Sequence, residues 1–304
     1  MQAFLITAYK DQGQLVKLIK SLNEHAYVYV HVDRKSTAIS IDELNAMELQ
    51  NTYIFNKYRI GWGTYTHLLA IQDMVRMALE NPDVHYIHTL SAQDMRIVSW
   101  KELEERFADN EHIYMTCTNA DDIPKKTRER FVKRIVTSRG ITRRYVKRVV
   151  NKMNKTYRKF QDKFNISWSD IKPFKEIYKG MIWVSMPRAA AEYAMKYARR
   201  GCTFMRTLSH VTLPEEFFFQ TVFWNSEFRK DIVNINLRYT DWVKRHGSRP
   251  AILDETDIDK IKESDCIFAR KIDVKISKDL IPMIEEYVKQ DVWDNRKRDT
   301  CFMY

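Results

Sequence analysis

Glycine is scarce in this chain, and the glycine-rich motifs that bind nucleotide phosphates are missing. Its 304 residues include seven glycines, and neither a GxGxxG nor a GxxxxGKS/T spacing occurs among them. Both motifs need glycine because the backbone must turn tightly and approach a phosphate closely. The sequence therefore excludes a GxGxxG dinucleotide-binding fold and a P-loop nucleotidase.

Long apolar runs and paired cysteines are missing as well. No stretch of 18 apolar residues occurs, and the first residues, MQAFLITAYKDQG, contain neither a basic leader nor a small-residue cleavage site. We therefore expect a protein that neither spans a membrane nor is exported by its own signal. The cysteines lack CxxC spacing, which favours reduced thiols in a cytosolic setting over zinc ligands or disulfides: Cys117, Cys202, Cys266 and Cys301.

Charge is distributed unevenly along the chain. Fifty-one Lys and Arg oppose 40 Asp and Glu, which gives a net charge of +11. Segment 125–163 alone carries 16 basic and two acidic residues, so the rest of the chain is slightly acidic. Such a cluster favours anionic partners: phosphates, acidic lipid headgroups, nucleic acid or acidic glycans. With 44% apolar residues, the chain can build a sizeable core.

The first third of the sequence alternates between strand and helix patterns. Two strands and the helix between them, within about thirty residues, predict a parallel βαβ unit with a right-handed crossover. The sequence therefore predicts an α/β fold with a mixed, mainly parallel sheet flanked by helices. The expected elements here are strands at 3–9, 27–33, 52–56 and 84–90 and helices at 15–22 and 65–79.

Polar residues collect where the predicted strands end. Tyr9 ends the first strand, Asp33 ends the second, and Asp94 follows the fourth. Ligands of open parallel sheets bind beyond the carboxyl ends of the strands. The sequence therefore predicts a nucleotide site at this edge.

Residues 140–164 predict a basic amphipathic helix. Tyr145, Val149, Met153 and Phe160 recur at helical spacing, with Lys and Arg on the other faces. Most such helices pack the apolar stripe on their own domain; the alternative is docking on an anionic membrane surface. The elements expected after it are a strand at 181–186, a helix at 188–199, a strand at 232–239 and a helix that begins within 254–264.

Seven segments occur in an order that resembles one enzyme family, the core-2/I-branching enzymes. These are family 14 glycosyltransferases, which include β-1,6-N-acetylglucosaminyltransferases and peptide xylosyltransferases. The resemblance implies a GT-A-type fold, a nucleotide-sugar donor, inversion at the anomeric carbon and no metal. The segments are VYVHVDRKS (28–36), GWGTYTHLLA (61–70), YIHTLSAQDMRI (86–97), KGMIWVSMPRAAAEYAM (179–195), LPEEFFFQT (213–221), LRYTDW (237–242) and SDCIFARKID (264–273).

On this resemblance, residues 1–304 form a single GT-A-like catalytic domain. No linker rich in Pro, Gly or Ser separates independent units. The expected parts are a nucleotide-binding βαβ part at 1–100, a basic helical insertion at 125–165, an acceptor and catalytic part at 175–275, and a C-terminal helix and tail at 276–304.

The local sequence agrees with a site that uses no metal. Metal-dependent GT-A enzymes carry a DxD pair where SAQD, residues 91–94, stands here, because a divalent cation wants more than one hard oxygen ligand. Asp94 is one carboxylate instead of two, and Asp33 is followed by Arg34 and Lys35, which would repel a cation. Asp33 and Asp94 are instead expected on the donor nucleotide.

Without a metal, fixed cations must meet the negative charge that develops on the departing diphosphate. The resemblance implies an arginine and a lysine near the C-terminal end of the match for this role. The lysine corresponds to Lys271 in FARK, and the arginine to Arg270 or Arg238. The other interpretation of these residues is solvated surface charge.

Glu216 is the expected catalytic base. An inverting transfer needs a group that takes the proton from the acceptor hydroxyl. In the family the base is the second acid of a PDE-like motif, which maps to Glu216, and Glu215 is expected on the acceptor side. Pro214 followed by two acids is also a usual helix start, so helix capping is the alternative. The apolar run behind them predicts a partly desolvated carboxylate with a raised pKa.

The remaining site assignments are weaker. Tyr9 and Trp62 are expected on the nucleotide and Trp183 along the sugar site, with core packing as the alternative for both tryptophans. Lys126 and Arg130 lie where animal branching enzymes contact the acceptor, although KKTRERF departs from their pattern.

The sequence thus predicts an inverting, metal-independent transferase that uses a UDP-sugar, with N-acetylglucosamine as the first candidate and xylose as the alternative. The expected acceptor is a glycan or a lipid-linked glycan. The expected location is the cytoplasm, at the inner membrane face, with 125–163 as the attachment. Open alternatives are a metal-dependent retaining transferase, a glycoside hydrolase and a nucleic-acid-binding protein. We expect no nucleic-acid partner, because no RNP, zinc-finger or helix-turn-helix signature accompanies the basic segment.

Overall fold

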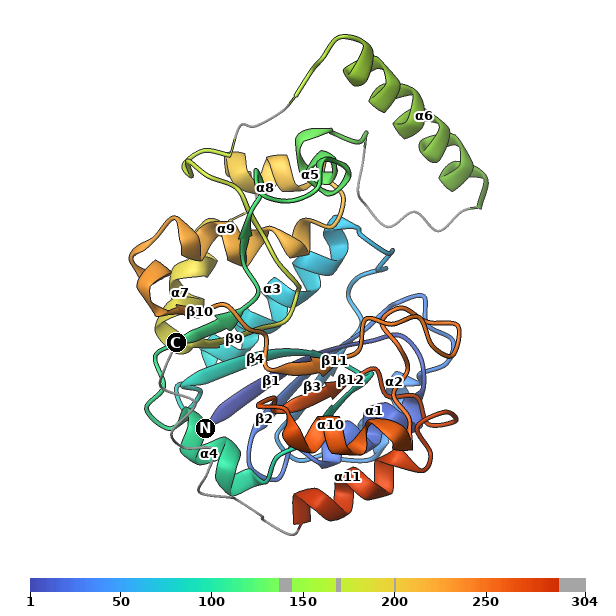
Figure 1. Ribbon diagram of the computed structural model, residues 1–304, viewed down its shortest axis with the longest axis vertical. Coiled ribbons are helices and arrows are strands. Elements are labelled where there is room, and N and C mark those ends of the chain that lie inside the picture. Colours follow the sequence, from blue (N-terminus) through green and yellow to red (C-terminus); the bar gives the residue numbers. More distant parts are fainter. Residues whose placement is uncertain (137–143, 168–170, 200, 290–304) are drawn as a thin grey trace.

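Seven strands form the central sheet of the computed structural model (Figure 1), which describes residues 1–136, 144–167, 171–199 and 201–289. The strands are β1 Gln2–Ala8, β2 Tyr27–Val32, β3 Thr52–Phe55, β4 Tyr86–Ser91, β5 Asp94–Arg96, β6 Ile113–Met115, β7 Thr118–Asn119, β8 Tyr178–Lys179, β9 Val184–Pro187, β10 Ile232–Val233, β11 Arg238–Thr240 and β12 Phe268–Arg270. The α-helices are α1 Gln12–Lys20, α2 Ile41–Ala46, α3 Tyr65–Glu80, α4 Trp100–Phe107, α5 Lys125–Val132, α6 Arg144–Lys163, α7 Arg188–Tyr197, α8 Thr203–Leu208, α9 Phe218–Trp224, α10 Ile258–Glu263 and α11 Leu280–Lys289; short 3-10 turns are η1 Pro214–Glu216, η2 Glu227–Asp231 and η3 Glu255–Asp257.

The central sheet has the order β10-β6-β9-β4-β1-β2-β3. β9 runs antiparallel to both of its neighbours, β4 and β6, whereas the other pairs are parallel. A second sheet has the order β11-β12-β5, and β7 pairs with β8. The predicted α/β class with a mixed, mainly parallel sheet flanked by helices is confirmed.

Both faces of the central sheet are covered by helices. Along β1, Ala3 and Leu5 belong to a buried cluster with α3, α7 and α9, whereas Phe4 and Ile6 belong to one with α1, α4, α10 and α11. Successive strand side chains point to opposite faces. A strand covered on both sides therefore needs an apolar run rather than an alternating pattern, which is what residues 3–6 provide.

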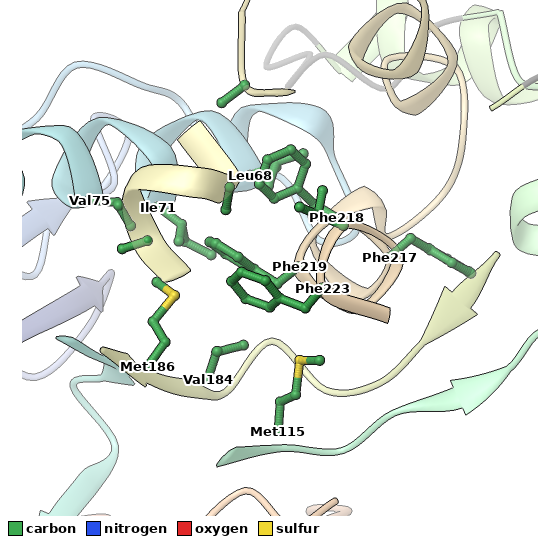
Figure 2. Close-up of a cluster of buried hydrophobic side chains, with 14 of the residues drawn as sticks. Leu68, Ile71, Val75, Met115, Val184, Met186, Phe217, Phe218, Phe219 and Phe223 are labelled. Carbon is green, nitrogen blue, oxygen red and sulfur yellow. The ribbon is translucent and has the colours of Figure 1, made fainter. Parts of the chain in front are cut away.

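The aromatic run after the two glutamates is part of this core. Phe217, Phe218, Phe219 and Phe223 are fully or almost fully buried. Figure 2 shows the rings of Phe219 and Phe223 among side chains of α3 and β9, whereas Phe217 points away from them and packs on Phe131. The sequence expectation of a buried aromatic face behind the glutamates is confirmed.

One predicted strand was wrong. Residues 232–239 form two short strands, β10 and β11, which lie in different sheets. Leu237 between them has a φ of 55° and is buried, so the chain turns there instead of continuing as one strand. This turn carries β11 alongside β12, where it pairs in parallel.

The basic helix forms as predicted, but its surroundings differ from the usual arrangement. α6 lies at one end of the molecule, beyond α5 and α8 (Figure 1). Most of its apolar side chains are exposed instead of packed on the domain. Residues 140–143 of the predicted helix lie outside the described residues.

Two other sequence expectations can be compared with the described part of the chain. No helix there is long and apolar enough to cross a membrane. Cys117, Cys202 and Cys266 are free thiols, and Cys301 lies outside the described residues. The division of the chain into functional parts, with its tail at 276–304, stays a prediction.

Candidate active site

Glu215 and Glu216 lie in the short turn η1, directly before helix α9. Leu213 begins this turn with a φ of 61°, and its N–H donates to the carbonyl of Gly63 at 3.1 Å. Neither glutamate side chain caps the helix, because α9 has no side-chain cap hydrogen bond. The two carboxylates are therefore available for other contacts.

The Glu216 carboxylate lies between two cations. Its Oε2 is 2.7 Å from Lys179 Nζ and 4.0 Å from Arg130 Nη1. The side chain as a whole keeps 20% of its surface exposed, whereas Oε2 itself is buried. Burial raises the pKa of Glu216 above its ordinary value, and the Lys179 ammonium opposes part of that shift.

Glu215 points the other way, into the protein. It is 3% exposed, and its Oε1 lies 3.1 Å from Nδ1 of His67 on α3. A buried carboxylate with a histidine partner anchors the turn to α3. The structure separates the two adjacent glutamates, and the predicted acceptor role of Glu215 stays a prediction.

The backbone beside Glu216 is held by a glycine. The N–H of Gly180 donates to the Glu216 carbonyl at 2.9 Å. A Cβ atom at position 180 would lie 1.6 Å from the carbonyl oxygen of Thr116, so a side chain cannot fit without moving backbone. The side chain of Gln220 donates to the next carbonyl, that of Met181, at 2.7 Å. These contacts fix Lys179 beside Glu216.

A second polar centre lies at the end of β12. Arg270 Nη1 donates to Asp94 Oδ1 at 2.8 Å and to the Ser91 hydroxyl, and its guanidinium lies 4.3 Å from the Trp183 ring centre. The Ser91 N–H donates to the other Asp94 oxygen at 2.7 Å. Residues from β4, β5 and β12 therefore meet here with Trp183, which directly precedes β9 and is buried.

Lys271 adds a further cation to this centre. Its Nζ donates to the Ser248 hydroxyl at 3.1 Å. Burial lowers the pKa of Lys271, and the neighbouring charges of Arg270 and Lys10 lower it further. Lys10 in turn lies 3.3 Å from Asp273. An anion bound here would relieve the repulsion between these cations.

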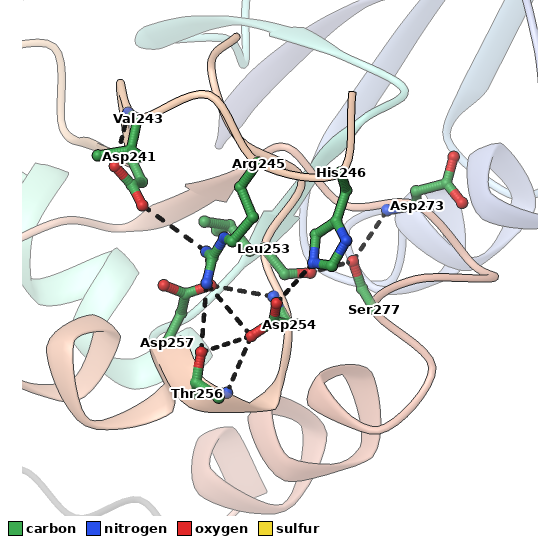
Figure 3. A network of polar contacts seen from close by, with 10 residues as sticks. All are labelled: Asp241, Val243, Arg245, His246, Leu253, Asp254, Thr256, Asp257, Asp273 and Ser277. Carbon is green, nitrogen blue, oxygen red and sulfur yellow. Dashed lines mark hydrogen bonds and ion pairs between the residues drawn. The ribbon is translucent and has the colours of Figure 1, made fainter. Parts of the chain in front are cut away.

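A polar network holds the loop that carries Ser248 (Figure 3). Arg245 pairs with Asp257, with Asp254 at 3.3 Å and with Asp241 at 3.7 Å. The backbone of Arg245 also bonds that of Ser248, at 3.0 and 3.2 Å. The network therefore fixes the hydroxyl that faces Lys271.

Arg238, the other candidate for the arginine, is 4% exposed and faces the interior. Its guanidinium donates to the backbone carbonyls of Thr89 and Asn236, and burial lowers its pKa to about 10. Between these two arginines, Arg270 is the one beside Lys271. The role of Arg238 in donor binding stays a prediction, and its visible contacts join β11 to β4.

The predicted nucleotide residues lie at the ends of β1 and β2 and in the loop before α3. Asp33 is buried and accepts from the backbone N–H groups of Lys35 and Ile60, at 3.1 and 3.0 Å. Tyr9 is exposed, and Trp62 is 81% exposed. Core packing is therefore excluded for Trp62, whereas buried Trp183 both packs and faces Arg270.

Among the predicted acceptor residues, Arg130 comes close to Glu216 and Lys126 is exposed on the same helix, α5. Sequence reasoning missed Lys179, although the residue opens the quoted segment KGMIWVSM. The available signal was a lysine directly before a glycine, in a segment already matched to the family. It also missed His67 and the Arg245 network, because their partners are distant in the sequence.

The two centres are joined by one short segment. Lys179 touches Glu216, and Trp183, four residues later, touches Arg270. An open pocket lined by Phe174, Trp224 and Arg229 lies elsewhere, and none of the predicted site residues line it. Within the described ranges, no cluster of three or more His, Cys, Asp or Glu residues could hold a metal ion.

Fixed cations at the strand ends, beside a half-buried carboxylate, can bind an anionic ligand. The family model for the Core-2/I-Branching enzyme matches residues 2–264. The chain therefore belongs to the Core-2/I-Branching enzyme family. Its mixed, mainly parallel sheet agrees with the GT-A-type fold that the sequence resemblance to this family implied.

Two curated proteins that are similar to the chain are named as transferases. The chain is 23% identical over 250 residues to xylosyltransferase sqv-6 of Caenorhabditis briggsae. The aligned region covers 80% of this chain and 29% of that protein. It is 22% identical over 284 residues to β-glucuronosyltransferase GlcAT14A of Arabidopsis thaliana, and that aligned region covers 88% of this chain and 60% of GlcAT14A. The chain thus spans less than a third of the xylosyltransferase.

Solved structures are similar only at a distance. S. aureus TarS 1–349 in complex with UDP-GlcNAc has a TM-score of 0.28 and 12% identity, over 38% of this chain and 34% of TarS 1–349. The bifunctional glycosyltransferase WbbM has a TM-score of 0.35 and 9% identity, over 97% of this chain and 50% of WbbM.

Proposed function

We propose that this chain is an inverting, metal-independent glycosyltransferase that moves a sugar from a UDP-sugar to a hydroxyl of a glycan or lipid-linked glycan. Glu216 is the general base in this proposal. The observation that carries it is the half-buried Glu216 carboxylate, held 2.7 Å from Lys179 and flanked by Arg130. Burial raises its basicity, while the two cations favour the ionised form that a base needs.

The departing diphosphate is assigned to the cations at the end of β12. Lys271 is half-buried among like charges, so a bound diphosphate would restore the stability that burial and Arg270 take from its charged form. Fixed cations of this kind stabilise charge that develops on a leaving group without reorganising during the reaction. Arg270 and Lys271 together supply two such groups.

Arg270 also supports the metal-independent part of the proposal. Both oxygens of Asp94 already accept hydrogen bonds, one from Arg270 and one from the backbone of Ser91. A guanidinium thus occupies the position beside the carboxylate that a divalent cation would need. The proposed chemistry therefore places the positive charge on side chains.

The donor sugar follows from two lines of support. The sequence resemblance makes N-acetylglucosamine the first candidate. Two of the similar proteins are named xylosyltransferases and one a β-glucuronosyltransferase, which makes xylose the second candidate and adds glucuronic acid to the test panel. The nucleotide is expected between exposed Tyr9, Asp33 and the cations of β12.

A thermal-shift screen with and without EDTA tests this proposal. UDP and UDP-sugars should raise the melting temperature, because a ligand at 100 times its dissociation constant stabilises the folded state by about 2.7 kcal/mol. The increase should persist in EDTA, and the sugar that is transferred should then be identified by product analysis. Activity that vanishes in EDTA would favour the metal-dependent retaining alternative, and no response to any uridine nucleotide would contradict the proposal.

Lys179 is expected to tune the base. Activity should fall as pH drops through the pKa of Glu216, because the protonated carboxyl cannot accept a proton. Lys179→Met removes the positive charge that opposes the burial effect, so the acid limb of kcat/KM should move to higher pH, and Lys179→Arg should restore it. Lys175→Met, at an exposed lysine of the same segment, is the control. An unmoved limb in Lys179→Met would mean that Lys179 does not act on the base.

A further inference from the structure

Helix α6 presents an uncovered apolar face. The side chains of Tyr145, Val149, Met153, Phe160 and Phe164, the last just after the helix, keep between 40% and 78% of their surface exposed. They recur four or seven residues apart, so they share one face of the helix. Exposed apolar side chains gathered on one face of an element make that face a candidate interaction site.

The helix is attached to the rest of the protein through polar side chains. Gln161 accepts from the backbone N–H of Arg134 at 2.9 Å and donates to its carbonyl at 2.9 Å. Asn154 accepts from the N–H of Val136 at 2.7 Å, and Arg158 donates to the Thr212 hydroxyl at 3.1 Å. Because these polar side chains make the contacts with the rest of the protein, the side chains of the apolar face of α6 stay exposed.

The charge around this face selects the partner. Segment 125–163 carries a net charge of +14, from 16 basic and two acidic residues. The exposed basic residues on α6 include Arg148, Lys152, Lys155, Lys159 and Lys163. A second copy of the chain would bring the same positive charge to the contact, and like charges repel. An anionic lipid surface offers both the apolar phase and the opposite charge.

We propose that α6 docks on an anionic membrane surface, with Tyr145, Met153 and Phe160 inserted among the lipid headgroups. The helix also adjoins the candidate site: Arg158 holds Thr212, three residues before Glu215, and Arg130 of α5 faces Glu216. Docking would bring the proposed base close to an acceptor that is itself anchored in lipid. The membrane contact can be tested without the donor, so its failure is separate from a failure of the proposed transferase activity.

Vesicle flotation of the full chain tests the proposal. The chain should float with vesicles of phosphatidylglycerol in phosphatidylcholine at low salt, much less with phosphatidylcholine alone, and less as salt rises. Met153→Ser combined with Phe160→Ser should reduce binding by about tenfold or more, because two apolar side chains no longer enter the lipid. Lys152→Glu combined with Lys159→Glu should remove the preference for anionic vesicles.

Matched controls lie on other parts of the surface. Met47→Ser, at an exposed methionine after α2, and Lys20→Glu, at an exposed lysine of α1, should float as the unaltered chain does. All variants change exposed residues, and circular dichroism with thermal melting verifies that they are folded. The proposal is overturned if the unaltered chain does not float, or if the Met153 and Phe160 double variant floats equally well. It is also overturned if size-exclusion chromatography shows a dimer that this variant dissociates, or if single-stranded RNA is bound while vesicles are not.

Discussion

Replacing Glu216 by glutamine is expected to reduce kcat by about 10²–10⁴-fold, the usual contribution of a general base. The amide cannot accept the proton of the acceptor hydroxyl, yet it has nearly the same shape as the carboxylate. The stabilising effect of UDP in a thermal melt should remain, because the assigned diphosphate cations lie at the other end of segment 179–183.

The fold should tolerate this change. Burial raises the pKa of Glu216, so the charged carboxylate is less favourable in the folded protein than in the unfolded chain. The free energy of unfolding that Glu216 contributes is therefore lost as pH rises through the raised pKa and the carboxyl ionises. A neutral amide avoids this cost, so the melting temperature should stay close to that of the unaltered protein. Glu227→Gln, at an exposed glutamate after α9, is the matched control and should keep full activity. Transfer by Glu216→Gln at a near-normal rate would show that another group is the base.

Replacing Lys271 by methionine is expected to reduce kcat by about 10²–10³-fold, as the loss of one fixed group that stabilises developing charge does in other enzymes. Methionine keeps the length of the side chain and removes its charge. The variant should also show a smaller increase in melting temperature with UDP, which distinguishes it from Glu216→Gln. Initial rates and thermal melts with UDP measure the two effects.

The matched control for Lys271 is Lys278→Met, an exposed lysine seven residues later. It should leave both the rate and the UDP response unchanged. Arg270→Ala is less informative, because it would leave the buried Asp94 carboxylate without its ion pair and would destabilise the fold. Full activity of Lys271→Met in EDTA would remove Lys271 from the leaving-group site.

Local sequence patterns were sufficient for the first part of the fold. The expected strands at 3–9, 27–33, 52–56 and 84–90 all appear, within one or two residues at their ends. Each is an apolar or alternating run bounded by polar residues, so the signal lies within the strand itself. The strand expected at 232–239 failed because Leu237 turns the chain between two sheets, and pairing with a distant strand decides such a turn.

The site was partly predictable for the same reason. Glu216 and Lys271 could be selected because seven segments of the chain occur in the same order as in a known family. The structure places cations near both residues. The resemblance could not choose between Arg238 and Arg270. Both lie at strand positions of similar character, and the choice depends on which side of the second sheet each side chain faces. The structure turns Arg238 inward and Arg270 toward Asp94 and Lys271.

The sequence by itself determined the α/β class, the family, the basic segment 125–163 and the turn that carries the two glutamates, because each is written in neighbouring residues. Only the tertiary structure decided that Glu215 is buried against His67 while Glu216 faces Lys179, and that the apolar face of α6 stays uncovered. The burial and the ion pairing of a side chain depend on contacts with residues far apart in the sequence, and only folding brings those residues together.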